Sequence, residues 1–252
     1  MSITITNLSY TYAAGTPLSI AALHQVNLTI ADGEFVGIMG RTGCGKSTLI
    51  QLIAGLLTPS SGQILLDGKD IQQKGYPRQE LRQKVGVVFQ YPEYQLFETT
   101  VARDVAFGLK HSGLDKKQIL ARVQWALEQM GFSYDRVKDL SPMGLSGGEK
   151  RRIAIAGVLA VKPKILILDE PIAGLDPTAR SDFLQLLTQL NREGVTILMV
   201  SHNADCLAEY AHRILVLEQG RIVLSAAGLA GQGAGRSSGT ANSAGASQPR
   251  YS

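Results

Sequence analysis

A glycine-rich stretch that directly follows an apolar run constrains this chain more than any other feature. Residues 34–39 (EFVGIM) have the pattern of a buried strand, and a helical pattern starts at residue 46. Glycines between a strand and a helix let backbone N–H groups turn inward around an anion, and the helix N-terminus adds partial positive charge. The stretch fits the pattern G-x-x-x-x-G-K-[S/T] with Gly40, Arg41, Thr42, Gly43, Cys44, Gly45, Lys46 and Ser47. It predicts a phosphate-binding loop, or P-loop, in an α/β fold.

Three side chains of this stretch have the chemistry that a bound nucleoside triphosphate needs. Lys46 places a positive charge near the β- and γ-phosphates, and Ser47 offers a hydroxyl to Mg²⁺. Thr48 is positioned for a further phosphate contact. ATP and Mg²⁺ are therefore the predicted ligands of the loop.

A second buried strand ends in two carboxylates. Residues 164–170 read KILILDE, so Asp169 and Glu170 follow four consecutive apolar residues. In open α/β sheets, ligands bind at the carboxyl ends of the strands. We expect Asp169 to hold Mg²⁺, directly or through water, and Glu170 to polarise the attacking water. The alternative is an ordinary strand followed by a polar turn.

The remaining patterns predict one α/β domain with two additions. Alternating apolar residues at 3–8 and 25–30 favour a small antiparallel sheet. More continuous apolar runs at 34–39, 85–89, 165–168, 195–200 and 213–217 favour a parallel sheet covered on both faces. Helical patterns cover 46–56, 100–110, 115–130, 147–160 and 178–193. Since residues 99–160 contain no convincing strand, we interpret about 91–160 as an inserted helical subdomain. The ATPase domain then spans 1–224, and the Ala/Gly/Ser-rich residues 225–252 are predicted to be a disordered tail.

Composition excludes several classes of protein. The chain has 252 residues with 44% hydrophobic content, which is enough for one substantial core. Its net charge is +4, of which Arg236 and Arg250 of the tail contribute two charges. The rest of the chain is therefore only weakly basic and lacks the dense basic stripe of a nucleic-acid-binding protein. No apolar run approaches the ~20 residues of a membrane span, and no secretory signal pattern is seen. Two isolated cysteines fit a reducing compartment better than a disulfide framework.

A second anion cradle follows the first by about 100 residues. Leu145, Ser146, Gly147, Gly148 and Glu149 precede Lys150-Arg151-Arg152 and an apolar helical pattern. One ATP does not need two helix N-termini from one chain, whereas two chains arranged head to tail can lend each other the second cradle. The LSGGE run resembles the signature motif of ATP-binding cassette (ABC) ATPases, and this resemblance covers most of the chain.

The resemblance assigns further residues in chain order. Tyr12 resembles the aromatic residue that stacks on adenine. Gln90 resembles the Q-loop residue that reaches Mg²⁺ and the attacking water. Asp176, in the run AGLDP, resembles the aspartate that crosses the dimer seam, and His202 resembles the switch histidine that touches the γ-phosphate. A lone histidine after a strand is more often an ordinary surface or core residue, so its assignment depends on the accompanying motifs.

A closer resemblance is to the ATPases of energy-coupling factor (ECF) transporters, which import vitamins and metal ions. It is carried by residues 91–97 (YPEYQLF), 101–108 (VARDVAFG), 10–17 (YTYAAGTP) and 154–160 (AIAGVLA). It implies a homodimer or a heterodimer with a related ATPase, on the cytoplasmic face of the cell membrane. It also implies a transmembrane coupling protein and substrate-capture membrane proteins. The chain departs from the pattern at two places. The signature motif ends in Glu149, where many ABC proteins have Gln, and residues 225–252 stand where ECF ATPases usually continue into a folded extension.

Two local hypotheses complete the interpretation. Leu96 and Phe97 fall in a loop rather than at core spacing, so residues 91–113 are interpreted as the groove for the membrane partner; the alternative is that they pack inside the helical subdomain. Cys44, beside Lys46 and a helix N-terminus, is expected to favour its thiolate.

Other functions fit the sequence less well. A soluble ABC ATPase not coupled to transport is the main alternative. Ribosome-acting members usually carry two ATPase domains and DNA-repair members long coiled coils, and neither is seen here. The intact Asp169–Glu170 pair and His202 argue against a non-catalytic regulator. The LSGGE segment has no role in a P-loop kinase.

Overall fold

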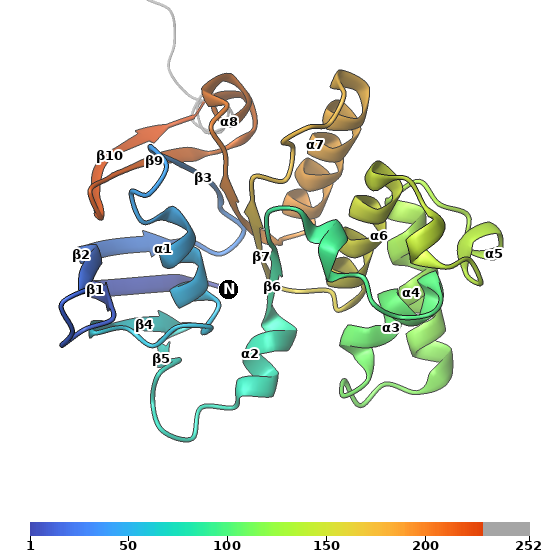
Figure 1. Ribbon diagram of the computed structural model, residues 1–252, viewed down its shortest axis with the longest axis horizontal. Coiled ribbons are helices and arrows are strands. Elements are labelled where there is room, and N and C mark those ends of the chain that lie inside the picture. The colour runs from blue at the N-terminus through green and yellow to red at the C-terminus, as the bar shows by residue number, and fades with distance from the viewer. Residues whose placement is uncertain (229–252) are drawn as a thin grey trace, which may run out of the picture.

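Two β-sheets form the framework of the structure, a computed structural model that describes residues 1–228 (Figure 1). The first is an antiparallel sheet in the order β2-β1-β4-β5, and the second has six strands in the order β10-β9-β3-β8-β7-β6. The antiparallel strands are β1 (Ile3–Tyr12), β2 (Ile20–Ile30), β4 (Ser61–Leu66) and β5 (Lys69–Asp70). The six-stranded sheet contains β3 (Phe35–Met39), β6 (Val85–Val88), β7 (Ile165–Asp169), β8 (Thr196–Val200), β9 (Arg213–Glu218) and β10 (Arg221–Ala227).

The six-stranded sheet is parallel from β9 to β6, as the continuous apolar runs predicted, and β10 joins its edge antiparallel to β9. Strand β8 lies between β3 and β7, with Asp169 paired opposite Val200. All five parallel strands end at the same edge of the sheet. This edge therefore receives the glycine-rich loop after β3 and the polar residues that follow β6, β7 and β8.

Helices connect the strands and lie on both faces of the six-stranded sheet. They are α1 (Lys46–Ile53), α2 (Arg78–Lys84), α3 (Val101–Ala106), α4 (Lys116–Gln129), α5 (Tyr134–Val137), α6 (Gly147–Ala160), α7 (Pro177–Arg192) and α8 (Ala204–Tyr210). Short 3₁₀ helices lie at η1 (Pro92–Gln95), η2 (Phe107–Leu109) and η3 (Pro142–Gly144). Capping boxes start α4 at Asp115 and α6 at Ser146, which explains why these helices begin where the sequence predicted.

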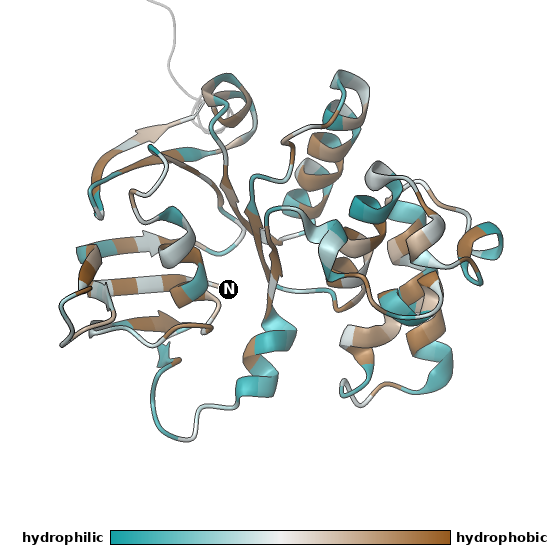
Figure 2. Ribbon diagram, viewed as in Figure 1, coloured by the Kyte–Doolittle hydropathy of each residue, from teal (hydrophilic) through white to brown (hydrophobic). Residues whose placement is uncertain are grey.

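Successive residues of the central strands face two different cores. In β7, Ile165 and Ile167 pack with the antiparallel sheet and α1, whereas Leu166 and Leu168 pack with α6 and α7. Figure 1 shows this division, with the antiparallel sheet and the helical segment on opposite sides of the six-stranded sheet. In Figure 2 the hydrophobic bands of the central strands lie between these two layers. Apart from Asp169 at the end of β7 and Thr196 at the start of β8, β7 and β8 are apolar at every position because both faces are covered.

The elements between residues 91 and 160 are all helical, as expected for the interpreted subdomain. At the other boundary the structure differs from the expectation. The predicted tail begins at residue 225, but β10 continues to Ala227 because its residues 224–227 pair with β9. The rest of the predicted tail, residues 229–252, lies outside the described residues.

Candidate functional site

The glycine-rich loop between β3 and α1 wraps around the ammonium group of Lys46. Lys46 Nζ donates to the carbonyl oxygens of Gly40 at 2.7 Å and Arg41 at 3.0 Å, and the side chain is buried. Gly45 has a φ of +108°, and a Cβ atom there would lie 2.5 Å from the carbonyl oxygen of Ala22. A side chain at this position would be both strained and in collision. Glycine is therefore required for the loop to keep its shape.

The first turn of α1 is connected to two other segments by side-chain hydrogen bonds. Ser47 Oγ lies 3.1 Å from Asp169 Oδ2 at the end of β7. Tyr12 Oη lies 3.0 Å from Thr48 Oγ1, which brings the end of β1 to the same helix. Burial raises the pKa of Asp169, and the hydrogen bond from Ser47 partly opposes this. A half-buried carboxylate beside a serine hydroxyl is a suitable pair of oxygen ligands for Mg²⁺.

Glu170 occupies a strained position directly after β7. Its φ is +51°, in the left-handed region that side chains other than glycine seldom adopt. Its Oε1 lies 3.2 Å from His202 Nε2, yet this buried oxygen has no hydrogen-bond donor of adequate geometry among the described residues. Burial raises the pKa of Glu170, and the neighbouring His202 partly opposes the shift. The carboxyl group therefore has an acceptor available for a water molecule.

These side chains line one cavity of about 460 Å³. The predicted residues that line it are Tyr12, Thr42, Gly43, Gly45, Lys46, Ser47, Thr48, Gln90, Asp169, Glu170 and His202. Of the remaining loop residues, Gly40 and Arg41 contribute carbonyl oxygens to Lys46, and Cys44 is buried with Sγ 4.0 Å from Lys46 Nζ. Sequence reasoning missed Ile20, Ala21, Ala22 and Ala173, which also line the cavity and carry no chemical signal.

The predicted second cradle lies elsewhere. Ser146, Gly148 and Asp176 line a separate cavity of about 550 Å³ between α6 and α7, and none of them lines the cavity that contains Lys46. Gly147 begins α6 and is exposed. Ser146 Oγ donates to Glu149 Oε2 at 2.7 Å and its backbone N–H donates at 2.9 Å, which lowers the pKa of Glu149. The two anion cradles of one chain are thus not arranged around one ligand.

Asp176 has a structural function that the motif did not predict. Its Oδ1 accepts from the backbone N–H groups of Thr178 at 3.0 Å and Ala179 at 2.9 Å, so it caps α7, with Pro177 at the first helical position. The capping bonds fix the end of the segment that joins Glu170 to α7.

Neither a metal cluster nor a disulfide accompanies the site. Residues 1–228 contain no group of three or more His, Cys, Asp or Glu side chains that could hold a metal ion. Cys44 and Cys206 are both free and buried. A cation held by Ser47 and Asp169 would need further ligands from phosphate oxygens, which suits Mg²⁺ bound together with a nucleotide.

Known proteins resemble this chain over most of its length. The ABC transporter family profile matches residues 23–173. The energy-coupling factor transporter ATP-binding protein EcfA2 of Clostridium acetobutylicum is 52% identical over 226 residues, covering 89% of this chain and 79% of the relative. EcfA2 of Symbiobacterium thermophilum is 50% identical over 222 residues, covering 88% of this chain and 77% of the relative.

Solved structures show the same fold. The protein cbiO1 of Clostridium perfringens, part of the ABC transporter complex cbiONQ, superposes with a TM-score of 0.79 at 40% identity, covering 93% of this chain and 91% of that one. The ATP-binding cassette MJ0796, solved as a dimer bound to ADP and Pi, superposes with a TM-score of 0.79 at 31% identity, covering 89% and 98%.

Proposed function

The chain belongs to the ABC transporter family, and we propose that it hydrolyses ATP in a dimer to power import through a separate transmembrane coupling protein. It is an ATPase subunit of the ECF type. The observation that carries the proposed site is the single cavity in which Lys46, Ser47, Asp169, Glu170 and His202 meet behind the glycine loop. Vitamins or metal ions are the proposed transported substrates.

ATP fits the residues that line this cavity. The glycine loop and the N-terminus of α1 present backbone N–H groups to the β- and γ-phosphates, and Lys46 exchanges its two carbonyl partners for phosphate oxygens. The exposed Tyr12 ring is the proposed platform for adenine. Ser47, Asp169 and Gln90 would hold Mg²⁺, which neutralises charge on the phosphates.

Hydrolysis needs little covalent chemistry from the protein. A water oxygen forms a bond to the γ-phosphorus while the bond from that phosphorus to the bridging β–γ oxygen breaks, and ADP leaves with that oxygen. Glu170 Oε1 orients the water and accepts its proton, and the raised pKa of this carboxyl makes it a stronger base. His202 and Lys46 stabilise the negative charge on the γ-phosphoryl group.

A second copy of the ATPase domain completes the site. Ser146 and Gly148 line a different cavity from Lys46, so in this proposal they contact the γ-phosphate bound to the other chain. Such pairing requires a head-to-tail arrangement in which each ATP lies between two subunits. The partner is either a second copy of this chain or a related ATPase.

The proposed surface for the membrane partner lies on the helical subdomain. Tyr91, Tyr94, Phe97 and Phe107 are large exposed aromatic side chains, and the Phe97 and Phe107 rings meet edge to face at 4.7 Å. Exposed aromatic patches of this kind are typical of protein interfaces. The expectation for Leu96 was wrong, because this side chain is buried in the core that the helices of residues 91–160 share with one face of the six-stranded sheet.

No helix of residues 1–228 is long and apolar enough to cross a membrane. We place the ATPase on the cytoplasmic face of the membrane, bound to a transmembrane coupling protein that also serves substrate-capture proteins. Residues 91–160 are the proposed helical subdomain of a single ATPase domain.

Co-purification tests the proposal directly. The tagged chain is extracted from membranes of its native host in mild detergent, and the bound proteins are identified by mass spectrometry. A transmembrane coupling protein, a similar ATPase and small integral-membrane proteins are the expected partners. Recovery of ribosomal proteins, or of no membrane protein, would refute the coupling to transport while leaving the ATPase chemistry in place.

A further inference from the structure

Arg151 is a buried cation outside the cavity that holds the nucleotide in the proposed function. It lies in the second turn of α6 and is 7% exposed. Among the lysine and arginine residues of 1–228, only Arg151 and Lys46 of the glycine loop are buried. Removing a guanidinium group from water costs several kcal/mol unless it is paired and hydrogen-bonded. The burial of Arg151 therefore depends on specific partners.

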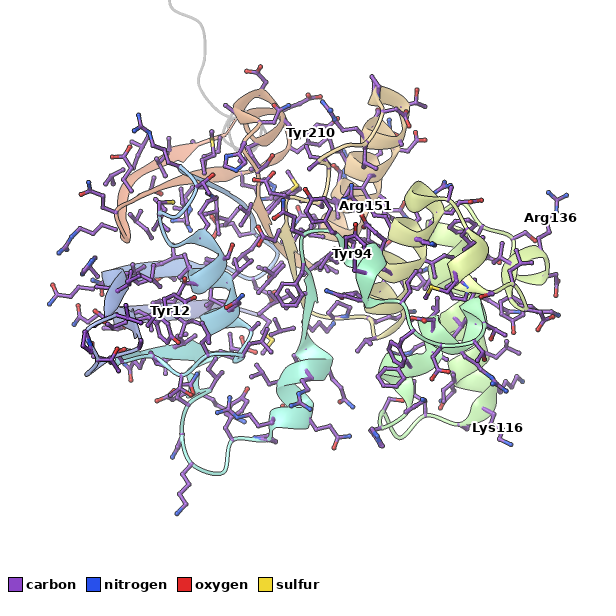
Figure 3. All side chains as sticks on the ribbon, in the orientation of Figure 1. Tyr12, Tyr94, Lys116, Arg136, Arg151 and Tyr210 are labelled. Atoms are coloured by element: carbon purple, nitrogen blue, oxygen red, sulfur yellow. The ribbon has the colours of Figure 1, made fainter. Side chains whose placement is uncertain are left out.

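Those partners come from two segments that are far apart in sequence. Arg151 Nε donates to Glu93 Oε2 at 3.3 Å, and Nη1 donates to the carbonyl oxygen of Ala173. Glu93 belongs to η1, three residues after Gln90, and Ala173 lies three residues after Glu170. Figure 3 shows Arg151 near the centre of the molecule, in the region where α6, η1 and the segment before α7 come together. One guanidinium group thus joins three segments.

The contact with Ala173 fixes a loop that separates two cavities. Ala173 lines the cavity of Lys46 and Glu170, whereas Arg151 lines the cavity of Ser146 and Asp176. The Ala173 backbone N–H donates to the Glu170 carbonyl oxygen at 3.3 Å, so the position of Ala173 affects that of Glu170. A residue held at positive φ, such as Glu170, keeps its conformation only when surrounding contacts impose it.

The contact with Glu93 leads to the proposed partner surface. Within the single turn of η1, Tyr94 is 85% exposed while the adjacent Glu93 side chain is directed inward, 19% exposed, onto Arg151. The turn η1 therefore presents Tyr94 at the surface and holds Glu93 against the buried Arg151. A displacement of η1 would change the Glu93–Arg151 contact.

We propose that Arg151 is a positioning residue that couples the partner-facing turn η1 to the Glu170–Asp176 loop, and so sets the position of Glu170 for hydrolysis. This inference rests on the proposed ATPase function. Arg151 does not line the nucleotide cavity. Its loss is therefore expected to reduce turnover without reducing ATP affinity.

The test compares variants of the full chain by ATP affinity, kcat and thermal midpoint. Arg151→Met keeps the length of the side chain and removes its donors, and Arg151→Lys keeps the charge but cannot contact both partners with a planar fork. Arg122→Met is the matched structural control, because Arg122 donates to the Ala160 and Val161 carbonyl oxygens at the other end of α6. We expect Arg151→Met to lower kcat at least tenfold with Kd for ATP within twofold, and Arg151→Lys to give an intermediate kcat.

A double-mutant cycle with Glu93→Gln tests the coupling between segments. If Glu93 acts through Arg151, Glu93→Gln lowers kcat in the wild-type chain and has no further effect beside Arg151→Met. If Arg151 has a purely structural role, Arg151→Met will lower the thermal midpoint, as Arg122→Met does, and will keep the wild-type kcat. This result would overturn the proposal. Additive effects of Glu93→Gln and Arg151→Met on kcat would overturn it as well. A wild-type chain without ATP turnover would instead refute the proposed function.

Discussion

Replacement of Glu170 by glutamine removes the proposed base and keeps the shape of the side chain. The carboxyl group is 13% exposed, and its Oε1 lies 3.2 Å from His202 Nε2 with no hydrogen-bond donor of adequate geometry in residues 1–228. A glutamine oxygen in this place can still accept a hydrogen bond from water, but it cannot take the proton. In the proposed site, ATP is bound by the glycine loop and Lys46, so binding should be retained.

The expected loss of turnover follows from the proton transfer. A positioned general base contributes about 10²- to 10⁴-fold to a rate. This range corresponds to about 3–5 kcal/mol of transition-state stabilisation. If hydrolysis separates the two subunits, the lifetime of the ATP-bound dimer should lengthen by the same factor. The variant should therefore collect as a dimer when ATP and Mg²⁺ are present.

The same substitution should stabilise the nucleotide-free chain at neutral pH. Because burial raises the pKa of Glu170, the folded state binds this proton more tightly than the unfolded state does. The stability that the group contributes is therefore fully present below its ordinary pKa of about 4.5 and is lost as the pH rises through the raised value. At pH 7 the carboxylate opposes folding, and Glu170→Gln removes that opposition. We expect a higher thermal midpoint.

Steady-state ATPase assays, gel filtration with ATP and Mg²⁺, and thermal unfolding measure these three effects. Glu193→Gln is a suitable control, because Glu193 is an exposed acid after α7 that does not line the nucleotide cavity. Its turnover and dimerisation should match those of the wild-type chain. Wild-type turnover in Glu170→Gln would refute the assignment of the base.

Three further outcomes follow from the site and the proposed partner surface. Gly45→Ala should abolish ATP binding measured by calorimetry because its Cβ would collide with the Ala22 carbonyl oxygen; binding close to that of the wild type would contradict the required loop shape. In a Cys206→Ser background, alkylation of Cys44 should block ATP binding, and bound ATP should slow the labelling; labelling with full activity would count against this. Phe97→Asp should keep the ATPase activity of the isolated chain and lose the membrane partner, and unchanged co-purification would remove the proposed surface.

Local patterns were sufficient to predict the central strands and long helices. Residues 165–168 are apolar at every position, and residues 195–200 at every position except Thr196, because both sides of β7 and β8 are buried. This pattern is visible without knowledge of their neighbours. The capping residues at 115 and 146 likewise act within one turn of their own helices. Elements with few buried residues were missed. Helix α2 buries Leu81 alone, and β10 is an edge strand with no buried residue, so neither has a strong apolar period.

The candidate nucleotide site was predictable for a related reason. The glycine loop, the Asp169–Glu170 pair and His202 each follow an apolar strand, and the ends of parallel strands meet at one edge of a sheet. A sequence that specifies parallel strands therefore also determines where the residues after them converge. The wall of the cavity at 20–22 was not predictable, because apolar and small residues acquire a function there only through their position.

Tertiary packing alone decided the environment of Leu96 and Arg151. Leu96 adjoins the exposed Phe97, and Arg151 belongs to a run of three basic residues, so nothing near them distinguishes a buried side chain from an exposed one. Whether each is buried depends on how η1, α6 and the loop before α7 pack together. More than 50 residues of sequence separate η1 from α6. Secondary structure and the ends of strands are properties of short segments, so the sequence by itself determined them. The pairing of a buried charge depends on the meeting of distant segments, so only the folded structure could decide it.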